Sequence, residues 1–163
     1  MEYVNNILGF FVMLPIILLI HEFGHVFFVK LFGGKVTNIT LGFGKKIISI
    51  GILDIRLLYF VSGHFYYENL EKDSKGSRIL ILLGGLIFNA ISMAIVFIPA
   101  LILYPEYDIY NIPMLATAFQ TFLEFSFMFV IFNLLPIRLN NMNTDGLQLY
   151  QLIRYGKSSL YGE

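Results

Sequence analysis

Three long runs with almost no charge place the strongest constraint on how this chain can fold. They cover residues 7–29, 79–103 and 113–137. The second run holds no charged residue and the third holds only Glu124. Each exceeds the roughly 20 residues that an α-helix needs to cross about 30 Å of hydrocarbon. We therefore predict a membrane α-helical fold, with three transmembrane helices in a single domain over residues 1–163.

The composition agrees with a lipid environment and excludes several classes of protein. Apolar residues make up 57% of the chain and charged residues 13%, against roughly 45–50% and about 25% in average soluble domains. Basic and acidic residues both number 11, so we expect no nucleic acid as a partner. The chain has no cysteine, which excludes disulfides and thiolate metal ligands. The expected surroundings are a lipid bilayer.

Basic residues in the connections predict the orientation of the spans. The connection over residues 30–78 is rich in lysine and arginine, whereas residues 103–113 carry acidic charges only. Basic loops stay on the cytoplasmic side. We therefore expect the first connection and the C-terminus to be cytoplasmic and the N-terminus to be outside, in a bacterial cytoplasmic membrane. The N-terminus lacks the basic region and the small-residue cleavage site of a signal peptide.

The first connection contains two segments with the pattern of β-strands. Residues 36–49 and 52–67 are rich in β-branched and aromatic residues and are interrupted by glycines. Both are too interrupted to span a membrane as helices. We expect a small membrane-associated β segment over about 36–67, at the inner membrane face, and then a polar return over 68–78 to the second span.

The first apolar run contains a metal-binding pattern, His21-Glu22-Phe23-Gly24-His25. Residues four apart lie on one face of a helix, so both imidazoles can reach one ion. Zinc suits two imidazoles plus a carboxylate, with a fourth position left for water, and Glu22 is the candidate general base. A carboxylate near the middle of a span costs roughly 2.5–3.5 kcal/mol on insertion scales, so such residues usually mark function.

A mononuclear zinc site of this kind needs a third protein ligand. The histidine of the metzincin extension is missing, because Leu31 occupies its position. Glu68 and Glu71 are alternatives in the polar return segment, and His64 is another in the β segment. Asp145 is the better candidate, because it follows the inner end of the third span.

Several short motifs occur in an order that points to a known family. They are H-E-F-G-H, Gly85-x-x-x-Asn89, Asn133-x-x-Pro136 followed by Asp145-Gly146, and the glycine-containing strands around Gly42-Phe43-Gly44 and Ser62-Gly63. Together they resemble the site-2 protease family (M50) of intramembrane zinc metalloproteases, over nearly the whole chain. The resemblance implies a compact form without an appended PDZ or CBS domain.

This resemblance implies one zinc ion per chain, bound by His21, His25 and Asp145, with Glu22 as the general base. It also implies that a peptide bond is hydrolysed in a transmembrane or membrane-proximal segment of another protein or of a membrane peptide. The supporting or substrate-binding residues that it implies are Asn89, Asn133, Gly85 and Gly63. Eight residues separate Pro136 from Asp145, against about four in the common family form, so this loop must fold back for Asp145 to reach the zinc.

Two other functions remain open on the sequence alone. One is a catalytically silent membrane adaptor of the same fold, and the other is a metal-ion transporter that uses the same histidines and acids. Transporters usually have more helices and internal repeats, which disfavours the second. The sequence does not predict the oligomeric state or the identity of the substrate.

Overall fold

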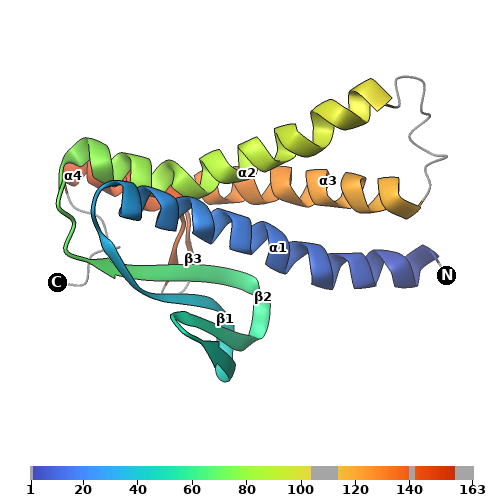
Figure 1. Cartoon of the computed structure of the whole chain (residues 1–163), viewed down its shortest axis with the longest axis horizontal. Coiled ribbons are helices and arrows are strands. Elements are labelled where there is room, and N and C mark those ends of the chain that lie inside the picture. The colour runs from blue at the N-terminus through green and yellow to red at the C-terminus, as the bar shows by residue number, and fades with distance from the viewer. Residues whose placement is uncertain (1, 104–113, 140–141, 157–163) are drawn as a thin grey trace.

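Three long helices and a bent two-stranded sheet make up most of the molecule (Figure 1). The computed structural model describes residues 2–103, 114–139 and 142–156. In chain order the elements are α1 (Glu2–Leu31), β1 (Lys35–Ile50), β2 (Leu53–Glu68), α2 (Lys75–Leu103), α3 (Met114–Leu134), β3 (Arg138–Leu139), β4 (Met142–Asn143) and α4 (Asp145–Tyr155). The sheet predicted between the first two helices is confirmed.

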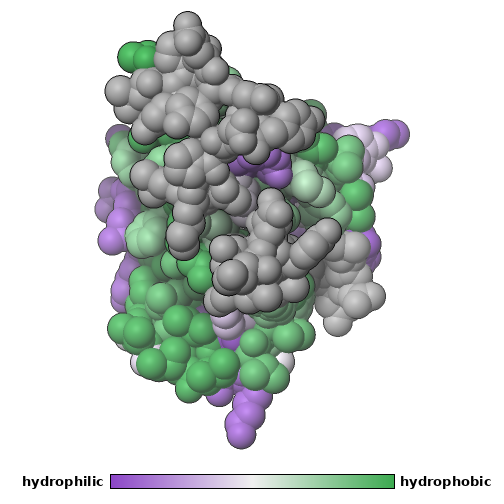
Figure 2. Space-filling view, turned by 90° about the vertical axis from the view of Figure 1, so that its right-hand side faces the viewer, coloured by the Kyte–Doolittle hydropathy of each residue, from purple (hydrophilic) through white to green (hydrophobic). Residues whose placement is uncertain are grey.

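Two helices are long and apolar enough to cross a membrane by length and composition. These are Phe11–Leu31 of α1 and Lys75–Ile98 of α2. The described part of α3 contributes a shorter apolar helix, Phe119–Leu134. Seen from the end where α1 begins, much of the described surface is hydrophobic (Figure 2). Large apolar side chains such as Phe23 and Ile95 are exposed, and lipid chains would cover such a surface.

The second helix begins at Lys75, four residues before the start that hydropathy predicts. The Oγ of Ser74 accepts a hydrogen bond from the backbone N–H of Ser77 at 3.1 Å. This contact satisfies one of the N–H groups that a helix start leaves without an intrahelical partner. The first turn of α2 is therefore polar but capped. For this reason, a prediction based on hydropathy alone places the start of the helix too late.

Helices α1 and α2 come closest where Gly24 faces Gly84. A Cβ atom on either glycine would overlap the backbone carbonyl of the other. Small residues allow two helix backbones to approach in this way. Ile81 of α2, three residues before Gly84, is fully buried and packs in a cluster with Val26 and Val29 of α1. The two glycines therefore set the distance between the two helices.

The sheet packs along α1, and Phe65 of β2 shares a buried cluster with Val26 of α1 and Ile81 of α2 (Figure 1). The ring of Phe60 on β2 contacts that of Phe11, with centroids 5.0 Å apart, and Phe65 stacks on His25 at 4.9 Å. The sheet thus runs beside the apolar stretch of α1, whereas we expected it at the inner end. The apolar contacts explain this position, because Phe65 of β2 and Val36 and Ile39 of β1 are buried in one cluster with side chains of α1.

Both strands are long and bent. The short segment 39–41 of β1 has partners in both halves of β2, at 53–55 and at 63–65. Gly42 follows this segment with a φ of 86°, a conformation that favours glycine. After it the far part of the hairpin turns away from α1 (Figure 1). The sheet is therefore doubled back on itself, and its central segment is 39–41.

A buried carboxylate stabilises the projecting part of the hairpin. Asp54 accepts a contact of 2.6 Å from the Nζ of Lys46 and a hydrogen bond of 2.6 Å from the Oγ of Ser49. These interactions, with that of Lys46 the largest, hold the pKa of Asp54 at about 2. The carboxylate is thus ionised at neutral pH and links the two strands.

We expect the change Gly84→Ala to lower the melting temperature of the detergent-purified protein. The new methyl group must push α1 and α2 apart, and overpacking of this kind typically costs about 1–3 kcal/mol. Circular dichroism on heating measures the change. Gly76→Ala is the matched control, because a methyl group there would meet only the Oγ of Ser74, at 3.8 Å. Equal melting temperatures for the two variants would contradict a close crossing.

Candidate metal centre

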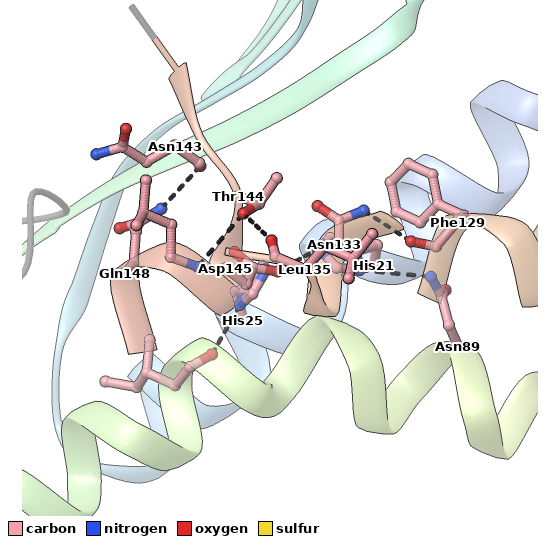
Figure 3. Close-up of polar contacts among 12 residues, drawn as sticks. His21, His25, Asn89, Phe129, Asn133, Leu135, Asn143, Thr144, Asp145 and Gln148 are labelled. Carbon is pink, nitrogen blue, oxygen red and sulfur yellow. Dashed lines mark hydrogen bonds and ion pairs between the residues drawn. The ribbon is translucent and has the colours of Figure 1, made fainter. Parts of the chain in front are cut away.

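Two histidines of α1 and one aspartate of α4 converge on one point (Figure 3). The Nε2 of His21 lies 2.8 Å from the Oδ2 of Asp145, and the Nε2 of His25 lies 3.4 Å from the same oxygen. Each residue offers one ligand atom, and these atoms lie within 4.8 Å of one another. The structure therefore brings together the three donors that the sequence singled out.

The orientation of His25 is fixed by a backbone carbonyl of α2. Its Nδ1 lies 2.7 Å from the carbonyl oxygen of Ile81. A carbonyl can only accept a hydrogen bond, so the Nδ1 of His25 carries a proton and donates it. In the neutral ring the lone pair then sits on Nε2, the atom that faces Asp145. Metal-bound histidines commonly have such an outer hydrogen bond, which fixes the tautomer.

The loop before Asp145 folds back through a short hairpin. Arg138 pairs with Asn143 in β3 and β4, and this hairpin takes up the extra residues that follow Pro136. Thr144 then closes it, because its Oγ1 donates to the carbonyl of Leu135 at 2.6 Å. The hairpin is thus the physical means by which Asp145 returns to the end of α3.

Helix α4 was not foreseen, since we expected only a ligand loop and a tail over residues 138–163. Thr144 is its N-cap and accepts a hydrogen bond from the N–H of Leu147 at 3.3 Å, and Gly156 is its left-handed C-cap. Gly146 lets α4 lie against α3, because a Cβ there would overlap the carbonyl of Leu134. Asp145 is therefore held at the start of a rigid helix.

The carboxylate of Asp145 is stabilised as an anion. Burial raises its pKa, but the neighbouring His25 and His21 lower it more, and the net pKa lies below the usual value. Its place in the first turn of α4 also favours negative charge, because the N-terminal end of a helix is partly positive. An ionised carboxylate is the form that binds a metal ion.

Glu22 is buried beside the donor set, with 3% of its surface exposed. Its Oε2 forms no hydrogen bond within the described part of the chain. Gly63 of β2 lies directly against this side chain, since a Cβ there would be 2.7 Å from the Cδ and Cγ of Glu22. Gly63 therefore makes the space that the Glu22 carboxylate occupies, and that carboxylate has an oxygen available for chemistry.

Two predicted supporting residues of α2 lie against the ring of His21. A Cβ on Gly85 would be 2.5 Å from its Cε1 and Nδ1. Asn89 is fully buried, with its Nδ2 3.4 Å from the Nδ1 of the ring (Figure 3). The ring of Phe129 from α3 makes a T-shaped contact with the same ring, with centroids 5.0 Å apart. Sequence reasoning did not find this aromatic contact.

Asn133 does not contact the donor set through its side chain. Its Nδ2 donates to the carbonyl of Phe129 at 3.0 Å, one turn earlier in α3 (Figure 3). The carbonyl of Asn133 instead lies near Gly146, where a Cβ would be 3.0 Å from it. The structure therefore places Asn133 at the junction of α3 and α4.

The alternative ligands lie elsewhere in the described structure. His64 alternates with Gly63 along β2, so its side chain is on the face away from Glu22. Burial, and then the charge of Arg56, lower its pKa. Glu68 and Glu71 are exposed, and Glu124 accepts a hydrogen bond from Gln120 of its own helix at 2.8 Å. We find none of these acids in the donor set.

We expect the detergent-purified protein to bind about one zinc ion per chain. His21→Ala and Asp145→Ala each remove one of three donors and should lose that zinc. Elemental analysis after dialysis against trace zinc measures the stoichiometry. His64→Ala is the matched control and should keep the zinc of the wild type. Retention of zinc by Asp145→Ala would place the third donor elsewhere.

Comparison with known proteins gives three findings. The model of "Peptidase family M50" matches residues 9–125. The chain is 32% identical over 157 residues to "Uncharacterized membrane protein YwmF" of Bacillus subtilis, covering 96% of this chain and 93% of that protein. A stretch of 45 residues, 28% of this chain and 13% of the relative, is 42% identical to "Putative zinc metalloprotease RC0203" of Rickettsia conorii.

The region that matches the family contains both histidines and Glu22, and it ends before Asp145. The place of Asp145 in the site therefore rests on its distances to the two imidazoles. With a family model that covers most of the chain and a relative that is similar over nearly its whole length, the chain belongs to peptidase family M50.

Proposed function

We propose that the protein is an intramembrane zinc metalloprotease of the site-2 protease type. It would hydrolyse peptide bonds in transmembrane or membrane-proximal segments of other proteins. The observation that carries this proposal is the convergence of His21, His25 and Asp145 next to a buried Glu22. Membership of family M50 and the likeness to a protein named as a zinc metalloprotease support it.

The chemistry of the donor set fits zinc. Two imidazole nitrogens and one carboxylate oxygen are a common set of protein ligands at catalytic zinc, which leaves one position open. The residues that would hold the ion are His21 and His25 through Nε2, and Asp145 through a carboxylate oxygen. When bound, zinc supplies Lewis acidity, which activates water for attack on an amide carbonyl.

Glu22 moves the proton in this reaction. Its unbonded Oε2 accepts the proton of the attacking water as the carbon–oxygen bond forms. The same carboxyl group then gives the proton to the amide nitrogen as the carbon–nitrogen bond breaks. Because Gly63 packs against the carboxylate, strand β2 limits where Glu22 can lie. Glu22 is thus held in place by an element other than its own helix.

We place this centre within the thickness of a bilayer. His21 lies ten residues before the end of α1 at Leu31, which is about 15 Å along the helix. The proposal takes α3 as a third span, supported by its apolar described part and its position alongside the other helices (Figure 1). The basic first connection supports a cytoplasmic location for that loop, in a bacterial cytoplasmic membrane.

The substrate would be bound as an extended segment. A helical amide is hydrogen-bonded within its own helix, so a transmembrane substrate must unwind locally before attack. In the described structure, residues 63–66 of β2 pair with residues 38–41 of β1, and Gly63 lies beside Glu22. Addition of a substrate strand to the other edge of β2 would bring a substrate carbonyl near the general base.

The change Glu22→Gln tests the proposal. We expect it to reduce cleavage by roughly 10²–10⁴-fold, because removal of a general base typically has that effect, while the zinc content stays at the wild-type level. The substrates are doubly labelled synthetic single-span peptides in proteoliposomes, and product formation is measured by mass spectrometry. A zinc-loaded wild type that gives no more product than Glu22→Gln would contradict the protease and favour a silent adaptor.

The change Gly63→Ala should separate zinc binding from hydrolysis. Its methyl group would displace the Glu22 carboxylate without touching the donor set, so we expect at least about a tenfold fall in kcat with zinc retained. The same peptides and the same zinc analysis measure both effects, with Gly76→Ala as the control. An unchanged kcat would show that β2 does not position Glu22.

A further inference from the structure

We propose that the outward face of α3 is an interface between two copies of this chain, held together by Gln120 and Glu124. In the membrane, the amide of Gln120 in each copy donates to the carboxyl group of Glu124 in the other. The inference goes beyond the proposed function and uses one part of it, the placement of α3 as a third span. It depends neither on zinc nor on hydrolysis.

Glu124 lies at the middle of α3. The helix covers Met114–Leu134, so ten residues separate Glu124 from each end, which is about 15 Å of helix in both directions. The hydrocarbon core of a bilayer is about 30 Å thick, so this carboxyl group lies close to the midplane when α3 spans it. Long basic side chains near helix ends can reach the headgroups, but Glu124 is neither long nor near an end.

The side chain of Glu124 faces outward rather than into the molecule. Glu124 is exposed, whereas Phe122 and Ser126, two residues to either side, are buried. The ring of Phe129 contacts His21, and the five residues from Glu124 to Phe129 turn about 140° around the helix axis. The carboxyl group therefore points away from the metal centre and toward the lipid.

A carboxyl group at this depth needs polar partners. Acidic residues within spans almost always face a bundle interior or a water-filled cavity, or pair with another polar group, because hydrocarbon offers no hydrogen bonds. Among the described residues, Glu124 accepts one hydrogen bond, from the Nε2 of Gln120 at 2.8 Å. That bond uses one of the two N–H groups of the amide and one oxygen of the carboxyl group. The pair can therefore both donate to and accept from a neighbour in the membrane.

The pair is complementary to a second copy of itself. Its donor and its acceptor lie one helical turn apart on one side of α3. In a two-fold symmetric contact the same patch meets itself, so Gln120 of each copy can donate to Glu124 of the other. A basic partner would need the carboxyl group alone and would leave the amide beside it without a role. Hydrogen bonds of this kind contribute to helix association in membranes.

Apolar side chains continue the same face toward the cytoplasmic end of α3. Phe127 and Ile131 follow Glu124 by about one and two turns, and both are exposed. The polar pair thus sits at one end of an apolar strip that a second α3 can cover. Because this strip is turned away from Phe129 and His21, a dimer formed here leaves the metal centre free.

Cysteine cross-linking tests the face. The chain has no cysteine, so a single introduced thiol reports its own neighbour without background. Ile131→Cys places a thiol on the proposed interface, at a residue that is 44% exposed, and Ile95→Cys on α2, at a residue that is 66% exposed, is the control. With copper phenanthroline as the oxidant in proteoliposomes of the full-length chain, we expect a disulfide-linked dimer from Ile131→Cys and little from Ile95→Cys.

Energy transfer measures the strength of association. Copies that carry a donor or an acceptor dye at Lys72→Cys, an exposed position, are mixed in proteoliposomes and diluted with lipid. We expect Glu124→Leu and Gln120→Leu each to weaken association about tenfold, the size expected for the loss of two polar contacts between spans. Glu124→Gln keeps a donor and an acceptor and should associate as the wild type does. Phe119→Leu, an exposed residue on another side of α3, is the matched control.

Two results would overturn the inference. One is a wild type that stays monomeric at every dilution, which would favour a basic residue of another membrane protein as the partner of Glu124. The other is association of Glu124→Leu as strong as that of the wild type. If circular dichroism shows that Glu124→Leu does not fold, equal cross-linking of Ile131→Cys and Ile95→Cys overturns it instead. A monomer that keeps its zinc contradicts the dimer alone, and a dimer without zinc contradicts the proposed function alone.

Discussion

The close contact of the α1 and α2 backbones at Gly24 and Gly84 is the constraint on which the metal centre depends. Gly24 lies between the two histidines in sequence, so the point of closest approach is also the point where the imidazoles leave α1. The crossing places His25 next to the carbonyl of Ile81 and His21 next to Asn89. The outer hydrogen bonds of both ligands therefore follow from helix packing, and a looser crossing would remove them together.

Two other elements complete what this helix pair begins. Strand β2 brings Gly63 to Glu22, and the start of α4 brings Asp145 to the histidines. Neither element is adjacent to α1 in the sequence, so a separate structural feature must bring each one to the helix. For β2 this is apolar packing on α1, seen in the stack of Phe65 on His25. For α4 it is the short hairpin closed by Thr144.

The sequence was informative where a pattern has a fixed geometric meaning. The spacing of four between His21 and His25 requires one helix face, and it predicted their convergence without further information. The sequence was uninformative where the hydrogen-bond partner is a backbone group. Every residue has a backbone carbonyl, so nothing in the sequence identifies Ile81 as the partner of His25. Helix α4 has readable caps in Thr144 and Gly156, but a polar tail after three apolar runs favoured a loop. Hydropathy also gave no information on which side of α1 the sheet would pack.

Glycines recur next to the polar residues of this site, and a common physical reason accounts for them. In an apolar interior a charged or polar side chain must have its partners close, and close approach is limited by the Cβ atoms of the neighbouring elements. Gly85 removes that limit beside His21, and Gly63 does so beside Glu22. Gly146 does the same where α4 meets the end of α3, one residue after Asp145. The geometry of the centre thus depends on the glycines next to it as well as on the donor residues. Glycines at these positions are therefore informative about function, although a search for polar residues alone would overlook them.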